Sequence, residues 1–147
     1  MLRASDVHSR TPSGRRTGPV TDYTLARRAV IAQCRRGVLN LLDVCDAHPE
    51  LLRAGRNIGR SVERECPICS RDTLRVVRYV FGEQLGRLSG RPVYPEDWVD
   101  ELVQQYEEFR CYAVEVCIDC SWNHLLASYL LGRRYSAPRR RTASTRR

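Results

Sequence analysis

An α+β fold is predicted by three features of this 147-residue sequence. Runs of β-branched and aromatic residues at 73–81 and 111–116 indicate two strands. Helical patterns with recognisable start and stop residues precede, separate and follow these runs. Two Cys-x-x-Cys pairs lie beside the strands: Cys66 with Cys69, and Cys117 with Cys120. Residues 20–132 are expected to form one domain, since this length suits a single core.

Two helices are expected before the first strand. The first runs from about Asp22, which can serve as its N-cap, to Arg36, and Gly37 is its stop signal. Its apolar stripe consists of Tyr23, Ala26, Val30 and Cys34, and the arginines that lie off this stripe are Arg27, Arg28, Arg35 and Arg36. The second helix begins near Pro49, a residue favoured in a first turn, and ends near Gly59.

A helix is also expected between the two strands and another after them. Glycines at 82, 86 and 90 predict a loop, and Pro95-Glu96-Asp97 opens a helix over about 95–109 with acids in its first turn. Its apolar stripe is Trp98, Leu102, Tyr106 and Phe109. Ser121 can cap a short C-terminal helix over 122–131, which Gly132 would end.

The cysteine pairs predict one structural zinc ion held by Cys66, Cys69, Cys117 and Cys120. The separation of 47 residues between the pairs exceeds the usual 15–20 or so. An antiparallel pairing of the two strands removes this difficulty, because their outer ends then bring Cys69 and Cys117 together. The result is a zinc-ribbon-like hairpin over 64–132 with an inserted helix, in which Cys120 begins the C-terminal helix and the metal anchors it.

Other uses of these thiols are weaker interpretations. A thioredoxin-like pair would precede a helix, whereas a strand follows Cys66. Four thiolate ligands leave no open position for substrate, so the zinc is expected to be structural rather than catalytic. Cys34, Cys45 and Cys111 are interpreted as small buried hydrophobes, and His124 as structural, with a role as ligand or base left open.

Charge is concentrated at the two ends of the chain. The net charge is +8, and all 25 basic residues are Arg, which favours codon bias of a GC-rich genome over selection for phosphate contacts. Four Arg and one Asp give residues 1–19 a charge of +3, and seven Arg without an acid give residues 133–147 +7. The remaining 20–132 carries −2. Both ends are polar, and they are predicted to be disordered tails.

Several classes of protein are disfavoured by what the sequence lacks. An odd number of cysteines and an N-terminus without an apolar stretch predict a reducing, cytoplasmic location. No apolar run approaches the ~20 residues that span a membrane. Without a Walker phosphate loop, a nucleophile elbow or a zinc-protease helix, no enzyme and no small-molecule substrate are expected.

The C-terminal arginines predict binding to phosphates, against the alternative of a merely solubilising tail. They are Arg133, Arg134, Arg139, Arg140, Arg141, Arg146 and Arg147. The acidic helix at 95–109 could instead be a docking surface for a basic protein, or simply a solvated face. Oxidation of the thiolates with release of zinc is a third hypothesis.

Residues 22–132 resemble an actinobacterial family, domain of unknown function 5318. The resemblance rests on Val114-Glu115-Val116-Cys117, Cys120-Ser121-Trp122-Asn123-His124, Tyr79-Val80-Phe81-Gly82-Glu83, Asp43-Val44-Cys45-Asp46 and Ser128-Tyr129-Leu130-Leu131-Gly132. It implies a zinc-ribbon-like region and no known activity. The cysteine knuckles are also similar to zinc ribbons of transcription and translation proteins. From this likeness and the Arg tails we expect a non-enzymatic protein that docks on RNA polymerase or the ribosome, with its tails on phosphates of RNA, more than DNA, and away from membranes.

Overall fold

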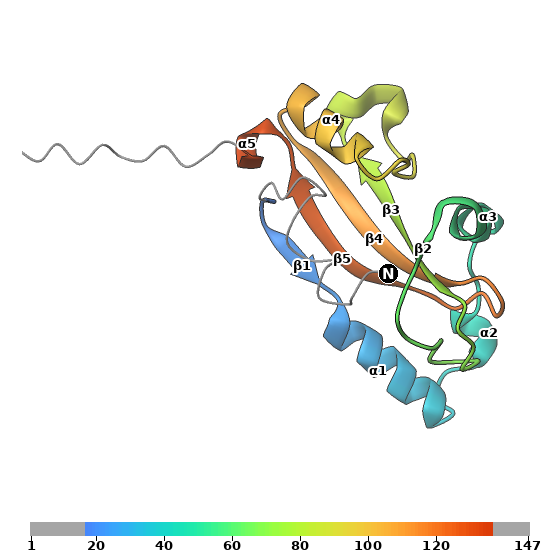
Figure 1. Cartoon of the computed structure of the whole chain (residues 1–147). Helices are drawn as coiled ribbons and strands as arrows, with labels where there is room; N and C mark the ends of the chain where they lie inside the picture. Colours follow the sequence, from blue (N-terminus) through green and yellow to red (C-terminus); the bar gives the residue numbers. More distant parts are fainter. Residues whose placement is uncertain (1–16, 137–147) are drawn as a thin grey trace, which may run out of the picture.

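The computed structural model describes residues 17–136 and contains one five-stranded antiparallel sheet (Figure 1). The strand order across it is β1-β5-β4-β3-β2. The strands are β1 (Val20–Asp22), β2 (Arg60–Ser61), β3 (Leu74–Phe81), β4 (Phe109–Cys117) and β5 (Asn123–Leu131). The expectation of mixed α and β structure is confirmed.

In this part of the chain, six helical segments surround the sheet. They are α1 (Thr24–Arg35), α2 (Leu41–Val44), α3 (Pro49–Ile58), the 3₁₀ segment η2 (Glu83–Leu88), α4 (Trp98–Gln105) and α5 (Arg133–Ser136). In Figure 1, α1 lies at the lower end of the sheet, whereas η2 and α4 lie at its upper end. Within 17–136, no helix is long and apolar enough to cross a membrane.

The expected antiparallel pairing of the two central strands is confirmed. Leu74 of β3 faces Cys117 of β4, and the register continues to Phe81 opposite Arg110. The inserted helix is shorter than predicted: α4 ends at Gln105, and Phe109 opens β4 instead. Phe109 is 2% exposed, so the apolar stripe that predicted a longer helix contained a core residue of the strand.

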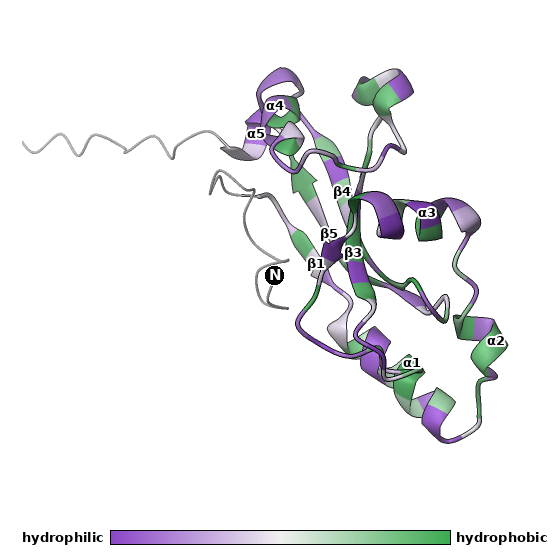
Figure 2. Ribbon diagram, turned by 45° about the vertical axis from the view of Figure 1, so that its right-hand side comes forward, coloured by the Kyte–Doolittle hydropathy of each residue, from purple (hydrophilic) through white to green (hydrophobic). Residues whose placement is uncertain are grey.

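Two apolar clusters fill the sheet's two ends. The first joins Ile31 of α1 to Leu74, Ala113, Cys117 and Trp122. The second packs Leu102 of α4 on strand residues that include Val80, Phe109, Cys111 and Tyr129. Figure 2 shows hydrophobic and hydrophilic residues interleaved along α1 and the strands, as partly buried elements require.

The predicted helix at 122–131 is wrong, because these residues form β5. This strand lies between β4 and β1, and Leu126 through Tyr129 are all buried. A strand buried on both faces reads as a continuous apolar run, which periodicity cannot distinguish from a buried helix. Cys120 therefore precedes a strand, and the idea that the metal anchors a C-terminal helix is wrong as well.

The ends of the domain also differ from the prediction. Asp22 belongs to β1, yet its carboxylate accepts a hydrogen bond from the Thr24 N–H (2.7 Å), close to the predicted capping role. Arg133 and Arg134, predicted to belong to a disordered tail, lie in α5. The preceding Gly132 has φ +130°, and a Cβ there would lie 2.1 Å from the Glu107 carbonyl oxygen. Only glycine permits this close approach. The tail predictions for 1–16 and 137–147 lie outside the described residues.

Candidate metal centre

The first cysteine pair occupies a tight turn between β2 and β3. The Ile68 N–H points at Cys66 Sγ (3.5 Å), and the Ser70 N–H donates to the Cys66 carbonyl (3.0 Å). Arg71 closes the turn, since its carbonyl accepts from the Cys66 N–H (2.9 Å). Ser70 has φ +60°, a left-handed conformation that a tight turn requires and that serine adopts at some cost.

The second pair repeats this turn between β4 and β5. The Cys120 N–H points at Cys117 Sγ (3.5 Å), and the Ser121 N–H donates to the Cys117 carbonyl (3.0 Å). The Trp122 carbonyl accepts from the Cys117 N–H (2.8 Å), and Ser121 has φ +69°. The two serines thus stand at matching left-handed positions. The two Cys-x-x-Cys pairs predict two similar turns, and the backbone forms both of them.

The four sulfur atoms converge between these turns. All lie within 4.8 Å of one another, with 3.6 Å between Cys66 and Cys120 and 3.7 Å between Cys69 and Cys117. These separations are well beyond the roughly 2.05 Å of a disulfide bond. Cys66 and Cys117 are buried, whereas Cys69 and Cys120 are half-buried. The four predicted residues are therefore together and could hold a metal ion.

Three of these four thiols have pKa values shifted from the usual one. Burial raises the pKa of Cys66 to about 11 and that of Cys120 further. Burial also opposes ionisation of Cys117, but hydrogen bonds from Thr73 Oγ1 (3.1 Å) and from backbone N–H groups outweigh it and lower its pKa to about 7. Cys117 is thus more easily ionised than Cys66 or Cys120, and a metal would have to displace protons from these two thiols.

A fifth thiol lies beside the cluster. Cys45, just after α2, has its Sγ 4.0 Å from that of Cys120. It is half-buried, and desolvation is the main reason its pKa is raised. Sequence reasoning treated Cys45 as a small hydrophobe. Its nearness to the cluster could not be inferred, because Cys120 lies 75 positions further along the chain.

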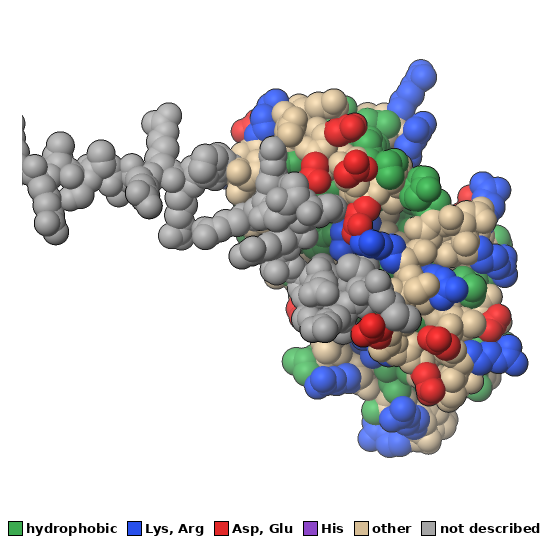
Figure 3. All heavy atoms as spheres, viewed as in Figure 1, with side chains coloured by type: hydrophobic (Ala, Val, Ile, Leu, Met, Phe, Trp, Pro, Cys, Tyr) green, Lys and Arg blue, Asp and Glu red, His purple; other side chains and the backbone are tan. Residues whose placement is uncertain are grey.

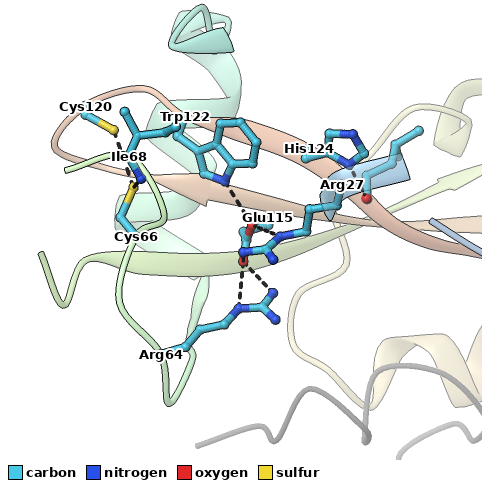
Figure 4. A network of polar contacts seen from close by, with 9 residues as sticks. Arg27, Arg64, Cys66, Ile68, Glu115, Cys120, Trp122 and His124 are labelled. Atoms are coloured by element: carbon cyan, nitrogen blue, oxygen red, sulfur yellow. Dashed lines mark hydrogen bonds and ion pairs between the residues drawn. The ribbon is translucent and has the colours of Figure 1, made fainter. Parts of the chain in front are cut away.

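A buried carboxylate fastens α1 to the same end of the sheet (Figure 4). Glu115, two residues before Cys117, has no exposed surface. It accepts hydrogen bonds from Arg27 Nε (2.8 Å), Arg64 Nε (2.9 Å) and Trp122 Nε1 (2.9 Å). Two guanidinium groups and an indole N–H thus compensate for burial of the charge. The sequence analysis did not predict this role. A signal was present, because Glu115 lies on the same face of the strand as Cys111, Ala113 and Cys117, and an acid on an apolar face indicates a buried, paired carboxylate.

Cys34, Cys111 and His124 pack against other side chains of the domain and do not belong to the sulfur cluster. The His124 ring stacks on Trp122 at 6.0 Å, and its Nδ1 lies 2.6 Å from the Leu125 carbonyl, away from the sulfur cluster. Cys111 is buried against the Tyr129 hydroxyl (3.3 Å), and burial raises the pKa of Cys111 to about 11. Cys34 packs against the first apolar cluster.

The structure places only part of the predicted phosphate-binding and acidic sets. Arg133 donates to the Gln105 carbonyl (3.1 Å), and Arg134 pairs with Glu108 (3.0 Å). Arg139, Arg140, Arg141, Arg146 and Arg147 lie outside the described residues. In the acidic segment, Glu96 forms ion pairs with Arg60 and with Arg78 (3.6 Å). Part of the predicted acidic surface is therefore neutralised within the domain.

Comparison with known proteins adds a family but no activity. Residues 14–145 match the model of a family described as "Family of unknown function (DUF5318)". Uncharacterised proteins of Mycobacterium tuberculosis and Mycobacterium bovis are each 44% identical to this chain over 126 residues, 85% of this chain and 91% of theirs. No solved structure matches the chain.

Proposed function

Because this chain belongs to the DUF5318 family of unknown function, we propose a function from its own residues. It is a non-enzymatic zinc-ribbon-like protein that docks on a nucleic-acid machine, RNA polymerase or the ribosome, and its Arg tail contacts backbone phosphates. RNA is the expected polymer. The proposal has three parts: the metal, the absence of catalysis and the basic tail.

The sulfur geometry supports zinc as the metal. Zinc bound by four thiolates is tetrahedral with Zn–S distances of about 2.3 Å, which gives S–S separations of about 3.8 Å. The Cys66–Cys120 and Cys69–Cys117 distances of 3.6 and 3.7 Å fit this value. Soft thiolate ligands in a tetrahedron also favour zinc over magnesium or calcium. The ion would hold the two turns together and would have no free position for substrate.

The surroundings of the ionisable groups favour a non-enzymatic role. Within residues 17–136, the buried carboxylate of Glu115 is held by hydrogen bonds from three side chains and has no exposed surface that a substrate could reach. His124 stacks on Trp122 and lies apart from the thiols. Neither group is paired with a nucleophile in the arrangement that covalent catalysis needs.

The observation that carries the nucleic-acid part is the run of seven Arg and no acid that starts at α5. Arg133 fixes the start of the run to the domain, since its N–H donates to the Tyr106 carbonyl (3.0 Å) and its guanidinium to Gln105. A charge of +7 over residues 133–147 attracts polyanions without reading their sequence. Arg also suits phosphate because its guanidinium can donate two parallel hydrogen bonds.

The tail is tested by measuring the affinity of the full chain for single-stranded RNA as a function of salt. Changing Arg139, Arg140, Arg141, Arg146 and Arg147 to Gln should weaken binding and reduce the log–log slope by about 0.7 for each phosphate that is no longer neutralised. The matched variant carries Lys at the same five positions and should keep most of the slope. If the Gln variant binds as the unchanged protein does, the tail has no role.

Docking on a large machine is tested separately. The tagged full chain is sedimented with purified ribosomes and, in a second experiment, with RNA polymerase at low salt. Specific co-sedimentation that the Gln variant loses supports the proposal. Retention after nuclease treatment and in the Gln variant would favour a protein-interaction module instead.

A thiol redox switch is the second candidate, because Cys45 lies 4.0 Å from Cys120. One peroxide molecule and one proton would oxidise the Cys45 thiol and the metal-bound Cys120 thiolate to a disulfide, and two waters would be formed. Cys120 could then no longer bind the metal. Peroxide should release zinc from the parent faster than from a Cys45→Ser variant, with Cys34→Ser as control. Equal release from all three would reject this role for Cys45.

A further inference from the structure

A groove lined by arginines runs between α1 and the first cysteine turn. Its volume is about 730 Å³. One wall carries Arg27, Arg28 and Arg35 of α1 and its C-cap residue Arg36. The other carries Glu65, Pro67 and Ser70 beside the candidate metal ligand Cys66. Basic side chains are visible over α1 at the lower end of the molecule in Figure 3. This groove is separate from the C-terminal Arg run.

The helix geometry explains why these arginines face one groove. Arg28 and Arg35 are seven residues apart, which places them on the same side of α1 about 10 Å apart along its axis. The adjacent Ile31, 8% exposed, belongs to the first apolar cluster and fixes which side of α1 faces inward. The arginines are thus presented along the border of the buried stripe.

The four arginines differ in whether their guanidinium groups already bind another side chain. Arg27 is bound to the buried Glu115 and is 13% exposed. Arg28, Arg35 and Arg36 are exposed, and within residues 17–136 their side chains form no hydrogen bond or ion pair. Glu65 lines the same groove without pairing with any of them in this part of the chain. Three unpaired guanidinium groups therefore share one concave surface, at a cost in mutual repulsion that an anionic ligand would relieve.

The candidate metal centre positions both walls. Cys66 lies in the turn that forms one wall, and Arg27 ties α1 to Glu115, two residues before Cys117. The metal-binding end of the sheet thus holds the arginines at a fixed distance from the turn. A rigid arrangement of donors loses less conformational entropy on binding than a free tail does.

We propose that this groove is a second binding site for the sugar–phosphate backbone, in which Arg28, Arg35 and Arg36 contact phosphates of single-stranded RNA. The inference rests on the proposed nucleic-acid function and adds a preformed site to it. The groove lies near the turns that precede β3 and β5, whereas α5 follows the opposite end of β5. Because β5 has nine residues, the two basic regions are separated by about 30 Å along the strand. One long RNA strand could contact both.

The test compares two variants of the full chain that lose the same charge. The groove variant carries Arg28→Gln, Arg35→Gln and Arg36→Gln. The control carries Arg56→Gln, Arg87→Gln and Arg91→Gln, which are exposed arginines outside the groove. Binding to a long single-stranded RNA is measured against salt, and circular dichroism and zinc content confirm that both variants fold.

The groove variant should bind RNA at least about tenfold more weakly than the unchanged protein, and its log–log salt slope should be smaller by about 2. The affinity and slope of the control variant should change little. Lys at the three groove positions should restore most of the slope. Equal behaviour of the groove variant and the control would overturn the inference. Single-stranded and duplex DNA serve as further probes, and tighter binding to duplex DNA than to RNA would contradict the assignment to RNA.

The outcomes separate this inference from the proposed function. If the tail Gln variant loses binding and the groove variant does not, the groove is rejected and the tail function stands. If only the groove variant loses binding, the tail's role is rejected and the groove stands. If the unchanged protein does not bind RNA at all, both are rejected.

Discussion

The two ends of the sheet are held together by different forces. At the α1 end, four thiols, a buried carboxylate and two arginines lie among the apolar residues. At the α4 end, the corresponding space is filled mainly by aliphatic and aromatic side chains such as Val80, Leu102 and Phe109. Cohesion of the first end should therefore depend on metal and charge pairing, and that of the second on the hydrophobic effect.

This difference also separates the candidate binding surfaces. The arginine groove borders the end with the candidate metal centre, whereas the Arg run begins beside α4, at the apolar end. Loss of metal should thus disturb the groove more than the attachment of the tail. Loss of a candidate metal ligand should have the largest effect on this contrast, and ionisation of Cys111 the smallest.

Loss of one candidate ligand should have the largest effect. Cys66→Ser should abolish stoichiometric zinc binding and lower the free energy of unfolding by several kcal/mol, because structural zinc contributes on the order of 10 kcal/mol in small zinc domains. Urea unfolding in metal-replete buffer measures the loss. Cys34→Ser is the control, since Cys34 is half-buried and outside the sulfur cluster. A Cys66→Ser protein with unchanged stability would contradict metal-dependent cohesion.

A cavity at the α4 end of the sheet should destabilise the protein without changing how much zinc it binds. Leu102 is 1% exposed in the second apolar cluster, so Leu102→Ala should cost about 2–5 kcal/mol. Zinc content should stay at the parental value. Loss of zinc in this variant would show that the two ends do not depend on separate forces.

Removing the buried charge of Glu115 should destabilise the α1 end of the sheet. Glu115→Gln leaves Arg27 and Arg64 without a carboxylate and should lower the free energy of unfolding by about 3–5 kcal/mol. The control Glu50→Gln breaks an exposed pair with Arg53 and should cost less than about 1 kcal/mol. Similar costs for the two changes would mean that the Glu115 network does not stabilise the α1 end.

Alkaline pH should affect the apolar end through Cys111. Burial raises the pKa of Cys111 to about 11 from a reference value of 9.0, so the folded protein binds this proton more tightly than the unfolded chain. The resulting stabilisation is complete below pH 9 and is lost as pH rises toward 11, by about 2 kcal/mol or less. Urea unfolding across this range should show a smaller loss in Cys111→Ala. The same loss in both proteins would exclude Cys111 as its source.

Local residue patterns predicted the cysteine centre and the central hairpin because their signals are short. Two residues between paired cysteines specify a turn, and the β-branched run at 73–81 favours a strand wherever it lies. Pro49 likewise marks the start of α3 correctly. For these elements, the local preference and the final fold agree.

The failures involve contacts between distant parts of the chain. Leu125, Leu126 and Ala127 favour a helix locally, but pairing of β5 with both β4 and β1 decides their conformation. β1 and β2 have three and two residues, too few for a periodic signal. The roles of Glu115 and Cys45 likewise depend on α1 and α2 being placed against the sheet, which no local pattern specifies.

The central claim is that four thiolates hold one structural zinc ion at the α1 end. It is tested most directly by measuring zinc per chain in the purified full-length protein and in Cys66→Ser, with Cys34→Ser alongside. We predict one zinc ion in the unchanged protein and in Cys34→Ser, and none bound stoichiometrically in Cys66→Ser. A folded, unchanged protein without zinc, or a Cys66→Ser protein that retains it fully, would contradict the claim.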